Sequence, residues 1–198
     1  TNVPDIEDMK RMGELLEDLG VRVEQTALRT FRLSPPKAPK HHPSDALFRR
    51  LRASIVLVGP LLARCGEVTF VFPGGCSIGR RPIDIFLDGF RNMGATIASE
   101  EDAECTTFTL RGKLKGADIF EKIPSVTATE TFLLAAVLAR GRTTIRNAAM
   151  EPEIVALAEF LNSSGARIEG AGTPTISVFG RAGKLLEGVE PVCKIIPD

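Results

Sequence analysis

Residues 90–97 read Phe-Arg-Asn-Met-Gly-Ala-Thr-Ile, which is the end of an amphipathic helical pattern, a glycine and the start of a β-rich segment. The same succession occurs at residues 16–23 and 161–168, and its three glycines are 74 and 71 residues apart. A glycine placed after a helix supplies the left-handed conformation that ends it. The chain is therefore predicted to repeat one structural unit three times.

Each of the three helical patterns opens on a proline with an acidic residue close behind it. Proline at the first helical position loses no hydrogen bond, and the acid interacts favourably with the positive end of the helix dipole. The residues are Pro4 with Asp5, Pro82 with Asp84, and Pro152 with Glu153. After each stop the sequence predicts a pair of short strands, for instance at 95–97 with 107–110 and at 166–168 with 175–179.

A second repeated element precedes two of these segments. A helical stretch at 52–64 is followed by a strand at 67–72, and a helix at 129–140 is followed by Gly141 and a strand at 143–146. The full unit is thus helix, strand, loop, helix, strand, strand, over roughly 70 residues. The first copy lacks its front half, so we expect about 40 residues of a threefold arrangement to be missing.

The composition indicates a globular α/β chain and no general affinity for polyanions. Its 198 residues are 43% hydrophobic, enough for one large domain, which we place at 1–198, or two small ones. Lys+Arg and Asp+Glu both number 25, so net charge gives no reason to expect nucleic acid or an anionic membrane as a partner. No apolar run approaches the roughly 20 residues that span a bilayer.

The cysteines and histidines do not have the spacing of a metal site. The four cysteines are Cys65, Cys76, Cys105 and Cys193. They contain no CxxC pair, and the two histidines, His41 and His42, are adjacent, so we expect neither a metal nor a cofactor. With no apolar leader before Thr1, we expect four free thiols and a cytoplasmic location.

Residues 73–84, which read Pro-Gly-Gly-Cys-Ser-Ile-Gly-Arg-Arg-Pro-Ile-Asp, are the chemically densest part of the chain. Arg80 and Arg81 would favour the thiolate of Cys76 and could grip a phosphate or a carboxylate. The alternative is a buried, inert cysteine in an ordinary glycine-rich turn. The combination with a helix start at Pro82 and Asp84 favours an anion site.

The proline-rich and basic segment 34–43 reads as a surface loop. Its functional alternative is a flap that brings positive charge to an anionic ligand.

These residues resemble the UDP-N-acetylglucosamine 1-carboxyvinyltransferase family of enolpyruvyl transferases. Residues 73–84 look like the catalytic loop of that family, and residues 52–55 with 59–61 look like its Arg-Ala-Ser helix. Residues 124–126 are similar to its second nucleotide-contacting turn, and residues 147–154 to its Asn-Ala-Ala-x-Glu-Pro-Glu-Ile signature. The resemblance runs over nearly the whole chain.

The resemblance implies a two-domain enzyme in which βαβαββ units with pseudo-threefold symmetry form inside-out α/β barrels. This chain would be most of one domain, with the first repeat truncated and the second domain absent. The family transfers the enolpyruvyl group of phosphoenolpyruvate to the 3-hydroxyl of UDP-N-acetylglucosamine and releases phosphate, the first committed step of peptidoglycan precursor synthesis. The family inhibitor fosfomycin alkylates the cysteine that corresponds to Cys76.

The resemblance also implies roles for individual residues. Cys76 corresponds to the catalytic cysteine, which protonates C3 of phosphoenolpyruvate or adds to it. Substrate binding is implied for Arg52, Arg81, Pro82, Ile83, Asp84, Ile85, Ser125 and Val126. We interpret Glu151 and Glu153 as helix-capping charges.

Departures from the family pattern leave alternatives open. Thr127 replaces a usual glycine, Ile123 stands where some members have lysine, and a Lys-Asn pair near the amino terminus has no counterpart. The missing domain carries the base that acts on the sugar hydroxyl, so the isolated chain is expected to be inactive. Alternatives are a non-catalytic domain of the same fold, or the shikimate-pathway enolpyruvyl transferase, which lacks the cysteine loop.

Overall fold

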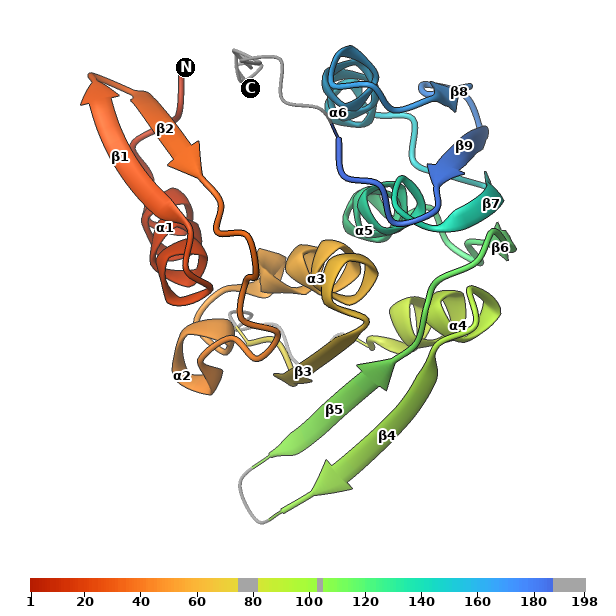
Figure 1. The fold of residues 1–198 in the computed structure, drawn as a ribbon, viewed down its shortest axis with the longest axis horizontal. Coiled ribbons are helices and arrows are strands. Elements are labelled where there is room, and N and C mark those ends of the chain that lie inside the picture. The colour runs from red at the N-terminus through yellow and green to blue at the C-terminus, as the bar shows by residue number, and fades with distance from the viewer. Residues whose placement is uncertain (75–81, 103–104, 187–198) are drawn as a thin grey trace.

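The computed structural model describes residues 1–74, 82–102 and 105–186, and Figure 1 shows their arrangement. Cys76, Arg80, Arg81 and Cys193 lie outside these residues. In chain order the elements are α1 Glu7–Asp18, β1 Arg22–Ala27, β2 Thr30–Ser34, α2 Asp45–Phe48, the 3-10 helix η1 Arg52–Leu57, α3 Val58–Cys65, β3 Glu67–Val71, α4 Asp84–Asn92, β4 Thr96–Glu101, β5 Thr106–Arg111, β6 Asp118–Phe120, α5 Val126–Ala136, β7 Arg140–Arg146, α6 Pro152–Ser163, β8 Ile168–Glu169 and β9 Thr175–Arg181.

The predicted repeat is present in this order of elements. The third unit, β6-α5-β7-α6-β8-β9, has the full βαβαββ succession, and its sheet has the strand order β6-β7-β9-β8. The second unit contains η1-α3, β3, α4, β4 and β5, with the sheet order β3-β5-β4. The first unit contributes α1 and the hairpin β1-β2. The three hairpins project in three different directions (Figure 1).

The glycine stops of the three units share one backbone geometry. Gly20, Gly94 and Gly165 have φ values of 92°, 88° and 92°. The residue after each glycine donates its N–H to the carbonyl oxygen five residues earlier; the pairs are Val21 to Leu16, Ala95 to Phe90, and Ala166 to Leu161. Each glycine also donates to the carbonyl three residues before it. These paired bonds form a Schellman motif, so the sequence prediction of a left-handed stop is confirmed.

A second backbone bond relates the front halves of the second and third units. Thr144 of β7 donates its N–H to the carbonyl oxygen of Ala117, just before the parallel strand β6, at 2.8 Å. At the corresponding place, Thr69 of β3 donates to the carbonyl oxygen of His41 at 2.9 Å. The segment that contains His41 therefore takes the position of a first strand in the second unit.

Two helix boundaries differ from the sequence prediction. Helix α1 begins at Glu7, because the preceding chain is bound to the hairpin, where Val3 donates its N–H to the carbonyl oxygen of Arg29. Helix α5 covers Val126–Ala136 instead of 129–140. It starts early because the hydroxyl of Ser125 caps it, and it stops early because backbone N–H groups at 181–183 bind the carbonyls of residues 137–139. Gly141 therefore lies within β7.

Helix α5 is the centre of the packing. Seven of its 11 residues are buried, which is typical of a helix in an interior position. The ring of Phe132 contacts the rings of Phe86 and Phe90 in α4, with centroids 6.4 and 5.8 Å apart. On another side, Gly59 of α3 lies so close that a Cβ there would be 2.5 Å from the carbonyl oxygen of Thr131.

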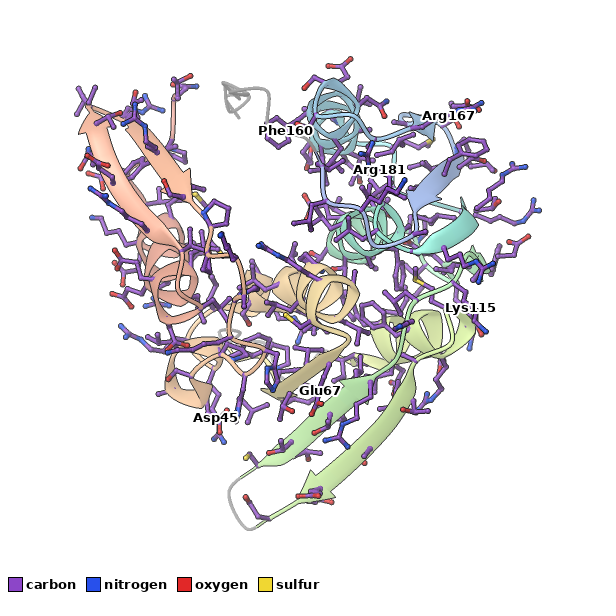
Figure 2. The ribbon with its side chains drawn as sticks, viewed as in Figure 1. Asp45, Glu67, Lys115, Phe160, Arg167 and Arg181 are labelled. Carbon is purple, nitrogen blue, oxygen red and sulfur yellow. The ribbon has the colours of Figure 1, made fainter. Side chains whose placement is uncertain are left out.

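The sheets lie outside these helices. Charged side chains such as those of Asp45, Glu67 and Arg167 lie toward the outside of the molecule (Figure 2), where Glu67 pairs with Arg111 and the guanidinium of Arg167 lies over the ring of Phe179. Among the described residues, no helix combines the length and the apolar character needed to cross a membrane.

The proline-rich loop joins the first unit to the second. Arg64, near the end of α3, donates to the carbonyl oxygen of Pro36 at 2.6 Å. Lys40 donates its N–H to the carbonyl oxygen of Leu19 and pairs through its ammonium group with Asp18 at 3.3 Å. These contacts bind the loop to the C-terminal ends of α3 and α1.

The close approach of α3 to α5 yields a matched pair of substitutions. Gly59→Ala would force the backbone of α5 to move, and overpacking of this kind costs about 1–3 kcal/mol. Gly13→Ala in α1 has nothing within 4 Å of the new Cβ, so its effect is the helix-propensity gain of up to about 1 kcal/mol. Denaturant unfolding is expected to show a less stable Gly59→Ala and an equal or more stable Gly13→Ala. Equal stability of the two variants would contradict the packing described for α5.

Candidate functional site

The predicted substrate-binding residues that the structure describes lie at the starts of helical elements. Arg52 is the first residue of η1, Asp84 is the first residue of α4, and Val126 is the first residue of α5. Cys76 and Arg81, the two remaining predicted site residues, lie outside the described residues. The N–H groups of a first helical turn have no acceptor within their own helix, so these positions are suited to oxygen ligands.

Arg52 and Pro82 are brought together by the fold. The guanidinium Nη2 of Arg52 lies 3.5 Å from the carbonyl oxygen of Pro82, 30 residues further along the chain. This contact places a permanent positive charge beside the turn that enters α4. Helix α5 packs against both η1 and α4, so the three helix starts belong to neighbouring elements.

The turn 82–85 offers two exposed side chains and one buried anchor. Pro82 and Asp84 are exposed, and Ile85 is half-buried. The side chain of Ile83 is 3% exposed and belongs to the core, so only the main chain of this predicted binding residue is available to a ligand. The side chain of Ile83 thereby fixes the turn that presents its neighbours.

Gly74, which precedes the undescribed part of the loop, has a packing reason to be glycine. A Cβ at this position would collide with the carbonyl oxygen of Arg49. The entry into the predicted catalytic loop is thus fixed by backbone-to-backbone contact.

Ser125 is already occupied by contacts within the protein. Its hydroxyl oxygen accepts the N–H of Ala128 at 3.3 Å, and its own N–H donates to the carboxyl group of Glu121 at 3.0 Å. The expected use of the Ser125 N–H for a ligand oxygen is therefore unavailable in this arrangement. The hydroxyl proton of Ser125 and the first-turn N–H groups of Val126 and Thr127 are the groups suited to that purpose.

Glu121 is a buried acid that the sequence analysis did not single out. Its side chain is 0% exposed, and besides the Ser125 N–H it accepts the hydroxyl proton of Thr129 at 2.8 Å. Burial raises its pKa from 4.5 to about 7, although the hydrogen bonds from Thr129 and Ser125 lower it. Strand alternation is the signal that would have found it, because Ile119 faces inward, Phe120 is exposed and Glu121 faces inward again.

The contacts of Glu121 extend to the loop that follows β7. The hydroxyl of Thr129 accepts the N–H of Ala149 at 3.0 Å, and the side-chain amide of Asn147 donates to the carbonyl oxygen of Glu121 at 2.8 Å. Asn147 has a φ of 55°, a left-handed conformation that asparagine tolerates better than most residues. The turn 121–125, the start of α5 and the loop 147–149 are thereby tied into one network.

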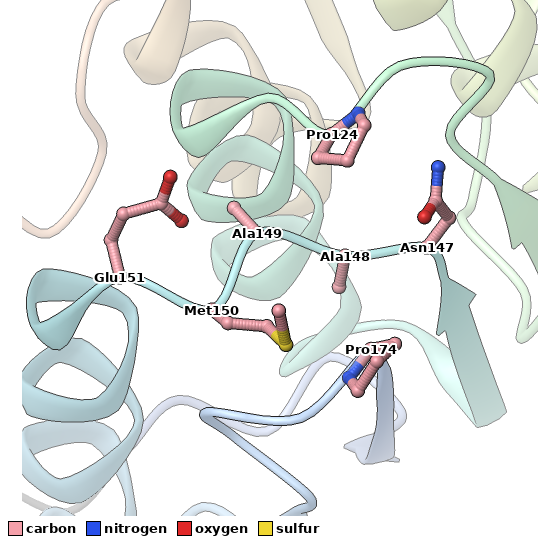
Figure 3. Close-up of a pocket in the computed structure, with 7 residues that line it drawn as sticks. All are labelled: Pro124, Asn147, Ala148, Ala149, Met150, Glu151 and Pro174. Carbon is pink, nitrogen blue, oxygen red and sulfur yellow. The ribbon is translucent and has the colours of Figure 1, made fainter.

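A surface pocket of about 330 Å³ lies next to this network. Figure 3 shows the segment 147–151 running between β7 and α6, with Pro124 on one side and Pro174 on the other. The pocket is lined by Pro124, Asn147, Ala148, Ala149, Met150, Glu151 and Pro174. The main chain of Glu151 precedes α6, but its carboxylate makes no capping hydrogen bond there, so the capping interpretation of Glu151 rests on charge alone.

The thiols in the described residues are free. Cys65 is exposed and Cys105 is half-buried, and neither is in a disulfide. Partial burial raises the pKa of Cys65, against the opposing effect of Arg64. In this part of the chain, no three His, Cys, Asp or Glu side chains are grouped so that they could hold a metal ion.

Comparison with known proteins matches this chain to one family over its whole length. The family model described as EPSP synthase (3-phosphoshikimate 1-carboxyvinyltransferase) matches residues 1–198. A UDP-N-acetylglucosamine 1-carboxyvinyltransferase of Campylobacter hominis is 42% identical over 199 residues, and one of Granulibacter bethesdensis is 46% identical over 202 residues. Both alignments cover 100% of this chain and 46% of the relative, so the chain spans under half the length of these curated relatives.

Solved structures agree on the fold. The enolpyruvyl transferase NikO from Streptomyces tendae superimposes with a TM-score of 0.78 at 22% identity, covering 93% of this chain and 43% of that protein. The EPSP synthase from Acinetobacter baumannii gives a TM-score of 0.71 at 22% identity, covering 93% and 41%. The predicted fold, repeated βαβαββ units in the inside-out α/β barrel of the enolpyruvyl transferases, is thus confirmed.

The buried acid of Glu121 yields a prediction for stability against pH. Between pH 4.5 and about 7 the unfolded chain ionises this group while the folded chain keeps it protonated, so its contribution to stability falls as pH rises and is constant above that range. Glu121→Gln cannot ionise, so its free energy of unfolding, relative to that of the wild type, is expected to rise by up to about 3 kcal/mol between pH 4.5 and pH 8. Thermal unfolding across this range measures the difference, with the exposed Glu159→Gln as the control. If the difference in stability between the wild type and Glu121→Gln did not change with pH, the raised pKa of Glu121 would be refuted.

Proposed function

We infer the function of this chain from its family, because the chain belongs to the EPSP synthase (3-phosphoshikimate 1-carboxyvinyltransferase) family. Within that family we propose that it is the cysteine-bearing domain of a UDP-N-acetylglucosamine 1-carboxyvinyltransferase. The observation that carries the proposal is identity of 42% and 46%, over the whole chain, to relatives of that name. The juxtaposition of Arg52 with the turn at Pro82 supports it.

The proposed reaction moves the enolpyruvyl group of phosphoenolpyruvate to UDP-N-acetylglucosamine. The oxygen of the sugar 3-hydroxyl bonds to C2 of phosphoenolpyruvate while C3 gains a proton, which gives a tetrahedral adduct. Loss of a C3 proton and departure of the phosphate group then form the enolpyruvyl ether. No oxidant, reductant or cofactor is required by this balance.

The residues of this chain would bind the anionic groups and handle one proton. Cys76 is proposed to exchange the C3 proton, because a thiol of adjustable pKa on a loop suits that task. Arg52 and Arg81 are proposed to bind the carboxylate and phosphate of phosphoenolpyruvate, using permanent charge and forked donors.

The sugar nucleotide would lie along the starts of α4 and α5. The turn from Pro82 to Ile85 is proposed to contact the uridine, and the Ser125 hydroxyl with the Val126 N–H to contact the diphosphate. Ile83 is proposed to contribute through its main chain, because its side chain is 3% exposed.

We propose that activity also needs the part of the relatives that lies outside their alignment with this chain. That alignment covers 46% of the Campylobacter hominis relative, and the first unit of the described residues holds one helix and one hairpin. The base for the sugar hydroxyl would come from that other part. We place the enzyme in the cytoplasm, where sugar nucleotides and phosphoenolpyruvate are available.

A chimera tests the proposed function. Residues 1–198 would replace the aligned part of the Campylobacter hominis relative, to which they are 42% identical. We expect the chimera to release phosphate only when both substrates are present, Cys76→Ser in the chimera to lose at least about 100-fold in rate, and the isolated chain to show no turnover. A chimera that unfolds cooperatively and binds the sugar nucleotide, but releases no phosphate, would instead favour a non-catalytic binding domain.

The four thiols should differ in reactivity. The raised pKa of Cys65 keeps it largely protonated near neutral pH, whereas the neighbouring arginines in the sequence favour the thiolate of Cys76. Alkylation of the native chain followed by mass-spectrometric mapping is expected to label Cys76 before Cys65, Cys105 and Cys193. Labelling of Cys76 last would defeat the proposed activation, and labelling after denaturation provides the control for intrinsic reactivity.

A further inference from the structure

The carboxyl group of Glu121 occupies a place that the proposed mechanism leaves unexplained. It lies beneath the turn 121–125 and binds the N–H of Ser125, the residue that caps α5. Through Thr129 it is linked to the N–H of Ala149, and its own carbonyl oxygen holds Asn147. Burial of an acid is costly unless it is hydrogen-bonded, and the bonds that offset the cost here also fix the geometry of the residues that make them.

The geometry that it fixes is the start of α5. The Ser125 N–H is drawn inward to Glu121, and the Ser125 hydroxyl oxygen turns toward Ala128. The first-turn N–H groups of Val126 and Thr127 lie next along the chain, without an acceptor in their own helix. Glu121 thereby determines which donors of this turn remain available to an oxygen ligand.

We propose that Glu121 is a positioning residue of the sugar-nucleotide site, which holds the turn 121–126 against the loop 147–149 so that the start of α5 meets the diphosphate. This inference rests on the proposed function, because the ligand is the one assigned to Ser125 and Val126 there. Glu121 acts through Ser125 and Thr129 and does not touch the ligand.

Charge makes this arrangement dependent on pH. A diphosphate at the start of α5 and an ionised Glu121 beneath the same turn would repel each other, so the ligand favours the neutral acid. The pKa of Glu121 near 7 means that the acid must take up a proton when the ligand binds at higher pH. The affinity of the wild type for the ligand is therefore expected to fall as pH rises above about 7, with a slope that approaches a tenfold loss per pH unit.

Other charged groups surround Glu121 but are engaged elsewhere or face solvent. Asp118 of β6 and Arg146 of β7 form an ion pair with each other at 2.8 Å. Lys122 and Glu151 are exposed. Glu130 of α5 is partly buried, and burial together with Glu153 of α6 raises its pKa, so it is the one nearby acid that needs its own control.

Two substitutions at Glu121 separate positioning from charge. Glu121→Gln keeps one oxygen that can accept the Thr129 hydroxyl, but its amide NH2 cannot accept the Ser125 N–H. Because it is neutral at every pH, its affinity is expected to be constant from pH 6.5 to 8.5. Glu121→Ala removes both hydrogen bonds and is expected to weaken binding about tenfold at every pH in this range. Glu130→Gln is the matched control and is expected to keep the wild-type pH dependence.

The test is an NMR titration of the chain with UDP-N-acetylglucosamine, following backbone amide signals of Val126 and Thr127 at several pH values. The diphosphate diester keeps its charge over this range, so a pH dependence reports on the protein. The inference would be overturned if the affinity of Glu121→Gln fell with pH as steeply as that of the wild type. It would also be overturned if Glu130→Gln were the only variant whose affinity no longer depended on pH. If the wild type did not bind the sugar nucleotide at all, both the proposed function and the positioning role of Glu121 would be overturned. If all variants bound it as the wild type does, the positioning role alone would be overturned.

Discussion

The approach of α3 to α5 at Gly59 is the constraint on which the other layers depend. Without a side chain at this position, the backbones of two helices from different units come closer than any other residue would permit. Helix α5 is then covered on several sides and buries seven of its 11 residues, while the sheets lie on the outside. Helix α5 also packs against η1 and α4, the elements that begin at Arg52 and Asp84.

The buried acid at Glu121 shows how the core and the site are connected. Removing a carboxyl group from water is costly, and the cost is limited here because the raised pKa, about 7, keeps the group mostly neutral below pH 7 and because both oxygens accept a hydrogen bond. The same hydrogen bonds settle the orientation of Ser125. The stability of the third unit and the availability of its ligand-binding groups therefore depend on one side chain.

Much of the fold could be predicted from the sequence because backbone rules are local. The glycine stops follow from left-handed φ values, and Pro152 at the first position of α6 follows from its missing N–H. The end of α5 could not be predicted, since it depends on N–H groups at 181–183, far along the chain. Glu121 was missed because hydrophobicity favours Phe120 inside, whereas strand alternation places Phe120 outside at 64% exposure. For the predicted site, the structure bears on Arg52, the turn 82–85 and the start of α5, while Cys76 and Arg81 stay predictions.

The equivalent backbone bonds from Thr69 to His41 and from Thr144 to Ala117 have a consequence for how such a molecule diversifies. Main-chain groups are the same in every residue, so copies that descend from one duplicated ancestor can keep this scaffold while their side chains diverge. At the junctions between strand and helix, side chains can therefore change while these main-chain bonds are kept. New chemistry can arise in a single copy there, without any change to the architecture that the copies have in common.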